Sequence, residues 1–283
     1  MKQIKFLPVA LAAALTLGFT SCSDDNDEPN AAPGNETSTV NPSTVFTAGV
    51  PSQVGDAVIT KNAEGLVTKI VDGDQIVTFD YAPAKSRAEV NIPTDYDMTM
   101  KVEWGNDEDG VDFYIKLNKE GFVEYAYEVD ESKIDGDTAE EWWFEYDPAD
   151  RLRYMKRSEG GNEVTRIDYD ASGDITKVSM RGEESSDDYS ISYTNEDITA
   201  PIANKGAIMY FDDCFGIDMD EFEPAYFAGL LGKATAHLPL SNTSGEETDT
   251  FTWSINENGF PVTLIIRENG SVSPSSPIFF NWL

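Results

Sequence analysis

Histidine, cysteine and basic residues are scarce in this chain of 283 residues. It has 1 histidine and 2 cysteines, and 20 lysines and arginines stand against 52 aspartates and glutamates, giving a net charge of −32. Zinc sites of the usual Cys/His kind therefore lack their ligands, and Ser-His-Asp or Cys-His catalysis would depend on His237 alone. The excess of acid also argues against nucleic acid and anionic lipid headgroups as partners.

Long hydrophobic runs are absent except near the N-terminus. A basic start is followed by an apolar run from Phe6 to Phe19, then by Ser21-Cys22 and an acidic stretch. The run is too short for a typical spanning helix of about 20 residues. A cysteine after such a run and a small residue is typical of the attachment point of a bacterial lipoprotein. The sequence therefore predicts a signal peptide over residues 1–21 and lipidation of Cys22.

The Ser-Cys-Ser-Asp-Asp arrangement around Cys22 resembles lipoproteins of the Bacteroidetes type, in which an acidic patch accompanies export to the outer face. We expect a lipid-anchored outer-membrane protein exposed at the cell surface, with the periplasmic face as the alternative. The simpler interpretation of the motif is a plain signal peptide with an unrelated cysteine. If Cys22 carries lipid, Cys214 remains alone and no internal disulfide can form.

Residues 22–46 are predicted to be the acylated cysteine and a disordered stalk. This stretch is rich in Asn, Pro, Ser, Thr and acidic residues and has almost no large apolar side chain. Such a composition cannot bury enough surface to order itself. The rest, residues 47–283, fits one large all-β domain or two small ones. Repeats along its length favour a single repeat-containing β domain.

A short motif recurs within this domain. Residues 62–70 align without a gap on residues 170–178, and looser copies begin at Asn118, Asp147 and Asn256. In each copy an Asn or Asp can brace a turn, and the residue three positions later must turn left-handed. That position is Gly in four copies and Asp150 in the fifth. These motifs predict hairpin corners.

Apolar and polar residues alternate on both sides of the corners. One predicted strand has Met98, Met100 and Val102 on one face. The strand that leads into the corner at Gly121 has Phe113, Ile115 and Leu117 on its apolar face. The strand that leads out of this corner is expected to have Val123, Tyr125, Tyr127 and Val129 on its apolar face. This period of two predicts an antiparallel meander with one apolar and one wet face. Residues 201–240 break the pattern, and residues 225–232 are expected to form a short apolar helix.

We therefore predict an all-β fold in which an antiparallel β-hairpin meander forms a large curled sheet or partial barrel. The short helical segment near the C-terminus is expected to pack on the sheet as its cover. Curling would limit the long exposed edges that a wide open sheet would otherwise present.

Two segments carry a resemblance to a known family. Residues 167–178, with Tyr169-Asp170, Gly173 and Ile-Thr-Lys-Val, look like a YD-type repeat. Residues 230–239, which precede a final hairpin, are similar to a motif of a family of Bacteroidetes lipoproteins built from such repeats. That family is an uncharacterised domain-of-unknown-function family. The resemblance extends over most of residues 57–266. No activity is established for that family, so the resemblance implies a fold and a compartment without a chemistry.

The densest acidic segment is a candidate metal site. Asp212, Asp213, Asp218 and Asp220 lie close together in the sequence, with Glu221 and Glu223 following. Hard oxygen ligands at this density could hold Ca²⁺, although EF-hand spacing is absent. The simpler interpretation is a solvated acidic surface in which some residues cap the following helix. Apart from Ca²⁺ no cofactor is predicted.

Two positions are candidates for contact with sugars. Trp143 falls on the face opposite Trp142 and Phe144, where an exposed ring could stack on a glycan, unless neighbouring strands bury it. Thr138 lies in Asp-Thr-Ala, which resembles the sequence at which Bacteroidetes export pathways attach O-linked glycans.

The expected function is that of a non-catalytic surface lipoprotein that binds a glycan, a surface protein or a metal. The alternative is an extracellular carbohydrate-active hydrolase, or a component of a metal-stabilised adhesin. Carboxylate pairs such as Glu140 with Glu141, or Glu145 with Asp147, could perform acid and base catalysis, but no feature of the sequence singles one pair out.

Overall fold

The structure, a computed structural model, describes residues 39–82, 95–105, 110–130, 139–158, 162–183, 186–273 and 276–282. All of them belong to the compact unit Glu36–Leu283. The predicted lipidation site Cys22 and glycosylation site Thr138 lie outside the described residues. Within these ranges, no helix is long and apolar enough to cross a membrane.

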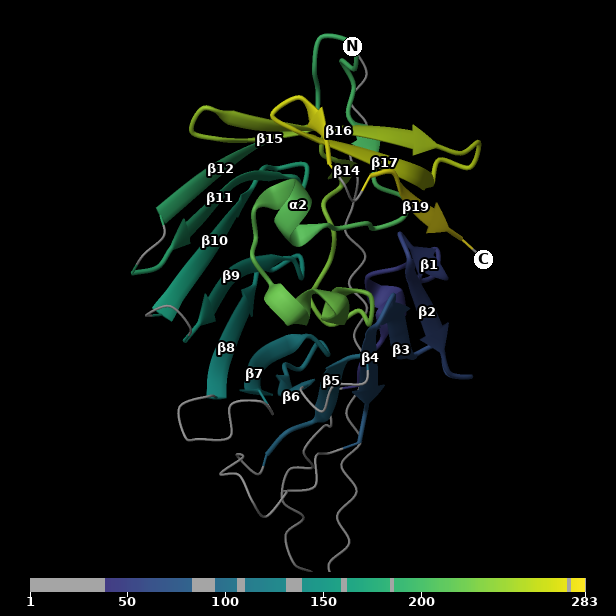
Figure 1. Cartoon of the computed structure of the whole chain (residues 1–283), viewed down its shortest axis with the longest axis vertical. Helices are drawn as coiled ribbons and strands as arrows, with labels where there is room; N and C mark the ends of the chain where they lie inside the picture. Colours follow the sequence, from purple (N-terminus) through teal and green to yellow (C-terminus); the bar gives the residue numbers. More distant parts are fainter. Residues whose placement is uncertain are drawn as a thin grey trace, which may run out of the picture. The chain divides into compact units, whose positions relative to one another are not determined.

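Antiparallel strands follow one another along the chain (Figure 1). They are β1 (Gln53–Val54), β2 (Ala57–Lys61), β3 (Val67–Asp72), β4 (Gln75–Asp80), β5 (Met98–Trp104), β6 (Gly110–Leu117), β7 (Val123–Asp130), β8 (Ala139–Tyr146), β9 (Leu152–Arg157), β10 (Glu163–Tyr169), β11 (Ile175–Arg181), β12 (Ser186–Ser192), β13 (Ile202–Ala203), β14 (His237–Leu238), β15 (Ser241–Ser244), β16 (Glu247–Ile255), β17 (Pro261–Glu268), β18 (Ser271–Val272) and β19 (Ile278–Asn281). The described residues also form three short helical elements, η1 (Pro42–Thr44), α2 (Phe211–Phe215) and η3 (Asp220–Tyr226).

The main sheet closes on itself. Strands β2 to β12 pair in chain order, β12 pairs with β15 across an inserted segment, and the series continues through β16 and β17 to β19. The short β1 joins the two ends, because Gln53 lies opposite both Asn281 of β19 and Val58 of β2. With β18 paired on the side of β17, the 17-stranded sheet contains a closed barrel of 16 strands. The prediction of a curled sheet or partial barrel is therefore wrong.

The repeated motifs form hairpin corners, as the sequence predicts. Asn62 Oδ1 accepts hydrogen bonds from the backbone N–H groups of Glu64 and Leu66, each at 3.0 Å. The other four corners are braced in the same way by Asn118, Asp147, Asp170 and Asn256. The left-handed positions have φ values of 95° at Gly173 and 66° at Asp150.

Each of these corners is followed by a β-bulge. In the β6–β7 hairpin, Leu117 lies opposite Val123 but Lys116 lies opposite Tyr125, which leaves Glu124 without a partner. The other corners shift register in the same place. Inward residues of the second strand are therefore first three positions apart: Val67 and Ile70, Val123 and Ala126, Leu152 and Met155, Ile175 and Val178, Pro261 and Leu264. Bulges bend and twist a strand, which favours closure.

Because of the bulge, the prediction of which β7 residues face the inside of the barrel is wrong. Tyr125, Tyr127 and Val129 were expected to continue the apolar face that starts at Val123. Instead Ala126 pairs with the inward Ile115, and Tyr127 pairs with the outward Tyr114. The three residues pack together on the outer wall beside Tyr96 and Tyr114. One extra residue in the strand is enough to exchange its two faces.

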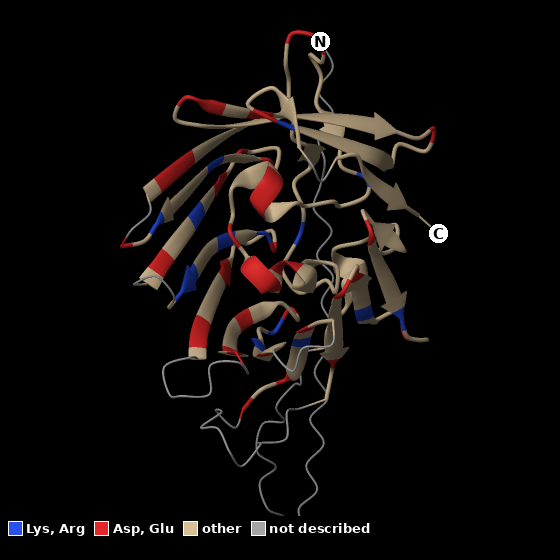
Figure 2. Ribbon diagram, viewed as in Figure 1, with Lys and Arg blue, Asp and Glu red and all other residues tan. Residues whose placement is uncertain are grey.

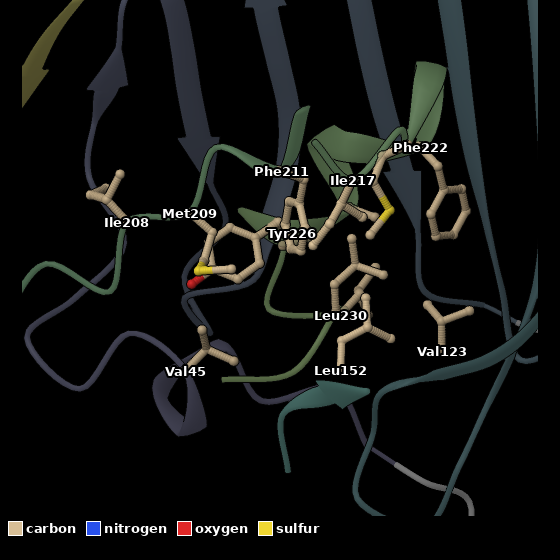
Figure 3. Packing of buried hydrophobic residues seen from close by; sticks show 14 of the residues in the cluster. Val45, Val123, Leu152, Ile208, Met209, Phe211, Ile217, Phe222, Tyr226 and Leu230 are labelled. Atoms are coloured by element: carbon tan, nitrogen blue, oxygen red, sulfur yellow. The ribbon is translucent and has the colours of Figure 1, made fainter. Parts of the chain in front are cut away.

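The segment from Asn204 to Leu240, called here the inner segment, fills the inside of the barrel. Its two helices α2 and η3 lie within the ring of strands (Figure 1). Phe222 of η3 contacts Phe113 of β6 at a ring-centroid distance of 4.9 Å and Phe144 of β8 at 5.3 Å. Phe211, Phe222 and Tyr226 are at most 2% exposed (Figure 3). A 16-stranded barrel encloses more space than its own side chains fill, so this segment completes the core.

The predicted helix over residues 225–232 is also wrong. The helical elements begin earlier, at α2 and η3, of which η3 overlaps the predicted range only at Ala225 and Tyr226, and the chain turns with positive φ at Gly229 (79°) and Gly232 (82°). These two glycines end any helix after Phe227. The inner segment also does not cover an open sheet, because the strands form a closed barrel and their apolar side chains point into its interior.

The two ends of the barrel differ. Because successive strands alternate in direction, the five braced corners share one end, called here the corner rim. The inner segment is fastened to it: Val123 N–H donates to Leu230 O (2.9 Å) and Lys233 N–H donates to Asp150 O (2.8 Å). Val45 and Phe46, which the sequence assigns to the stalk, are buried at 5% and 2% exposure. The opposite end, with the turns after β3, β11, β15 and β17, is called the acidic rim.

Candidate functional site

The four carboxylates of the predicted calcium site separate into two pairs. Asp212 and Asp213 belong to α2, whereas Asp218 and Asp220 pair with Arg157 of β9, whose Nη2 lies 3.1 Å from Asp218 Oδ2. Arg157 is buried at 8% exposure. This ion-pair cluster ties the approach to η3 to the barrel wall. Among the described residues, no group of three or more His, Cys, Asp or Glu side chains is placed to hold a metal ion.

A pocket of about 400 Å³ lies inside the barrel at the acidic rim. Strands β12, β15, β16 and β17 and helix α2 form its walls, and Figure 2 shows the concentration of acidic residues on α2. Its lining consists of Asp187, Tyr189, Asp212, Asp213, Gly216, Asn242, Ser244, Glu247, Asp249, Ile266 and Glu268. Six of these residues are carboxylates and none is basic. We call this cavity the acidic pocket.

Two carboxylates of the acidic pocket, Asp212 and Asp213, have raised pKa values although both residues are exposed at the barrel rim. Burial raises the pKa of Asp212 above its ordinary value, and the charge of Asp218 raises it further. Burial likewise raises the pKa of Asp213, with added contributions from Asp212, Glu268 and Asp249. Groups with such shifts in a cleft are typical of functional sites, although charge networks with a structural role also produce them.

Glu223 supports the helix that carries Asp212 and Asp213. Its Oε1 accepts a hydrogen bond of 3.0 Å from the backbone N–H of Phe211, the first residue of α2. Burial raises the pKa of Glu223 to about 7, and Asp213 and Asp212 raise it as well. Within the same helix, burial holds the pKa of the Cys214 thiol well above its ordinary value. This free cysteine is therefore a packed apolar residue.

Trp143 faces outward on β8, opposite the buried Trp142 and Phe144. Its ring meets Tyr125 edge-on at 5.8 Å, and Lys156 Nζ lies 4.7 Å from its centroid. One face of the indole is therefore engaged by a cation, which a stacking sugar would have to displace. A glycan contact at Trp143 stays a prediction.

His237, the single histidine, is held in a structural contact. Its Nδ1 lies 2.7 Å from Asp174 Oδ2, and its backbone N–H donates to Asp174 Oδ1 at 2.9 Å. Asp174 is buried at 3% exposure. The pair connects β14 to a braced corner, in agreement with a structural role for this residue.

The acidic residues considered for hydrolysis also have other partners. Glu141 accepts a hydrogen bond from Tyr125 OH at 2.8 Å on the outer wall. Glu145 pairs with Arg153 at 2.6 Å, and Asp147 braces a corner and binds Arg151. Glu140 and Glu141 are adjacent on one strand and point to opposite faces of the sheet. None of these pairs therefore converges on a common cleft.

Sequence reasoning missed the acidic pocket because its members are distant in the chain. Asp187, Asp249 and Glu268 come from three strands, and only their pairing in the barrel brings them to Asp212 and Asp213. One local signal was present: acidic residues occur at inward positions near the strand ends at this rim, where the alternation predicts apolar side chains.

Comparison with known proteins identifies the fold. A family model described as a domain of unknown function (DUF4595) with porin-like fold matches residues 55–263. The chain is similar to a porin-like protein from Bacteroides uniformis ATCC 8492, with 16% identity, a TM-score of 0.54, and coverage of 80% of this chain and 88% of that one. A porin-like protein from Bacteroides vulgatus ATCC 8482 is similar at 13% identity and a TM-score of 0.50, covering 82% and 98%.

No curated protein matches the chain. The family model extends over more than half of the sequence and agrees with the closed antiparallel barrel described above. The chain therefore belongs to the family of domains of unknown function with a porin-like fold.

Proposed function

We propose that this protein is a non-catalytic binding protein, lipid-anchored to the outer membrane and exposed at the cell surface. The observation that carries the proposal is the distribution of side chains across the barrel wall. On β5 the apolar residues point inward and are buried, with Met98, Met100 and Val102 at most 1% exposed, whereas the outer wall carries an aromatic cluster at β6 and β7. Thr99, Lys101 and Glu103 occupy the outward positions of β5.

This polarity is opposite to that of a barrel that spans a bilayer. A spanning barrel presents an outward apolar band about 25 Å tall and a polar interior. On β16 of this protein the outward residues are Thr248, Thr250, Thr252 and Ser254. In the described ranges, the large apolar side chains that are exposed are Val58, Val272 and Phe279. A wall of this kind favours water, so attachment to a membrane would need a separate anchor.

The filled interior argues against conduction. Porins of 16 to 18 strands retain an aqueous channel, whereas here Phe222 of the inner segment packs against inward-facing aromatic rings of β6 and β8. The porin-like architecture thus serves as a scaffold, and the acidic pocket is the strongest candidate for a binding site on it.

The described part of the chain begins at the end of the barrel opposite the acidic pocket. The chain reaches the barrel at the corner rim, since Thr39 O lies 2.7 Å from where a Cβ at Gly121 would stand. The acidic pocket opens at the other rim.

The test is the fate of Cys22→Ala in the native host. The wild type should incorporate labelled palmitate and stay with the outer membrane through high-salt washes. The variant should incorporate none and appear in the soluble fraction once its signal is cleaved, which mass spectrometry of its N-terminus verifies. A variant with a cleaved signal that still sediments with membranes would refute the anchor. Protease treatment of intact cells tests surface exposure, because a periplasmic protein would be protected.

A further inference from the structure

We propose that the outer wall of strands β8, β9 and β10 binds an acidic polysaccharide, a glycan whose sugar rings carry carboxylates. This site is separate from the acidic pocket, and its assignment rests on the proposed binding role but not on the lipid anchor. Two aromatic rings and two cations that face outward form it, and we call them the outer-wall patch: Trp143, Tyr154, Lys156 and Arg166. Arg166 is exposed, and the other three side chains are half-buried.

The outer-wall patch consists of two cation–ring pairs on neighbouring strands. Lys156 lies opposite Trp143 in the β8–β9 ladder, and its Nζ is 4.7 Å from the indole centroid. Arg166 lies opposite Tyr154 in the β9–β10 ladder, with its Cζ 5.7 Å from the phenol centroid. Lys156 and Tyr154 are two residues apart on β9, so the pairs are spaced by roughly 7 Å along the strand. Consecutive rings of one oligosaccharide could therefore lie over both pairs.

The two cations of the patch lack an acidic partner. Among the described residues, no carboxylate forms an ion pair with Lys156 or Arg166. Lys177, on the same wall, is paired with Asp188 at 3.3 Å. In a chain with 52 acidic and 20 basic residues, two neighbouring cations that rest on aromatic rings instead of carboxylates favour an anionic ligand.

The lysine over the indole discriminates between neutral and acidic glycans. A neutral sugar that stacked on Trp143 would displace Lys156 Nζ and offer no charge in return. A cation–ring contact at an accessible site is weaker than a charge-assisted hydrogen bond between an ammonium group and a carboxylate. A carboxylate on the sugar would therefore draw Lys156 from the indole and leave the ring free to stack on the sugar.

The positive charge at this wall is local. Figure 2 shows basic residues on β9, β10 and β11, and the outward ones are Arg153, Lys156, Arg166, Lys177 and Arg181. On these three strands the outward acidic residue is Asp168. Exposed charges are screened beyond about 8 Å at physiological ionic strength. A ligand at the patch therefore meets these cations first, although the whole chain has a net charge of −32.

The experiment is calorimetric titration of the purified full-length protein in detergent, with EDTA, at physiological ionic strength. The probes are short oligomers of galacturonate, of mannuronate and of hyaluronan, which differ in their sugar rings but all carry carboxylates. Methyl esters of the same oligomers keep the rings and remove the charge. We expect saturable binding of at least one acidic oligomer, and binding of its methyl ester that is weaker by roughly tenfold, as for the loss of a charged hydrogen bond.

Lys156 and Lys177 provide a matched pair of variants, because both are outward lysines but Lys177 is held by Asp188. Lys156→Gln should weaken binding by roughly tenfold, whereas Lys177→Gln should change the dissociation constant by less than about twofold. Trp143→Leu removes the stacking ring without changing the charge and should also weaken binding. Melting curves verify that all three variants are folded.

Equal dissociation constants for Lys156→Gln and Lys177→Gln would show diffuse attraction to the basic side of the wall and overturn the proposal. Equal binding of an acidic oligomer and its methyl ester, unchanged binding by Trp143→Leu, or no saturable binding of any acidic oligomer would overturn it as well. So would binding of phosphatidylglycerol vesicles with the same dependence on Lys156 and Trp143, which would assign the patch to a membrane surface. The Cys22 experiment can fail without affecting any of these results.

Discussion

Replacement of Glu223 by Gln should stabilise the protein at alkaline pH and have little effect at acidic pH. The pKa of Glu223 is raised from 4.5 to about 7, chiefly by burial. The folded state therefore holds a proton on this group that the unfolded state releases from about pH 4.5 upward. A raised carboxyl pKa means that stability falls as pH rises through this window and levels off above about pH 7. A shift of this size corresponds to a penalty of about 3 kcal/mol at pH 8.

Gln keeps the acceptor for Phe211 N–H but cannot ionise, so the variant should be more stable than the wild type by up to about 3 kcal/mol at pH 8. At pH 5 the difference should be small. Urea denaturation followed by tryptophan fluorescence at pH 5, 6, 7 and 8 measures this difference directly. Glu257→Gln, at an exposed corner, makes the same charge change outside the core and is the control. A Glu223→Gln difference that does not grow with pH would refute the reasoning.

Two further predictions concern the corners and the inner segment. Gly173→Val should destabilise the fold more than Ser172→Ala. A left-handed backbone costs an L-residue roughly 1–2 kcal/mol, and a Cβ at Gly173 would stand 2.8 Å from Arg151 Nη1. Equal melting temperatures of the two variants would contradict the corner geometry. Phe222→Ala should cost about 3–5 kcal/mol because its ring packs inside the barrel, whereas Phe279→Ala, at a side chain 54% exposed on the outer wall, should cost far less. Comparable losses in chemical denaturation would contradict the placement of the inner segment.

Local features of the fold could be predicted because they depend on neighbouring residues. The turn at Gly173 requires Asp170 three positions earlier and a left-handed residue, and both are visible in the sequence. The inward face of β5 follows from the alternation of Met98, Met100 and Val102. In both cases the controlling interactions lie within a few residues of each other, so periodicity and turn chemistry are sufficient.

Closure of the barrel could not be predicted in the same way. It depends on β1, a strand of two residues in which Gln53 contacts both β2 and β19. No local pattern in so short a segment specifies a partner more than two hundred residues away. The error on β7 has a different cause, because it follows from one unpaired residue, Glu124. A signal for it exists: after each braced corner, buried residues stand three apart, as in Val67 and Ile70 or Ile175 and Val178.

The same closure explains why the candidate site lies at one rim. The inner segment satisfies backbone groups at the corner rim, where Leu230 O accepts from Val123 N–H and Asp150 O accepts from Lys233 N–H. At the acidic rim, α2 instead brings Asp212 and Asp213 toward Asp249 and Glu268; partial burial and, after it, these neighbouring charges raise the pKa of Asp213, which works against folding at neutral pH. A fold stabilised so thoroughly at one end has no structural need for this repulsion at the other. Local rules that are broken without structural compensation are expected at functional sites, and this asymmetry supports a binding role for the acidic pocket.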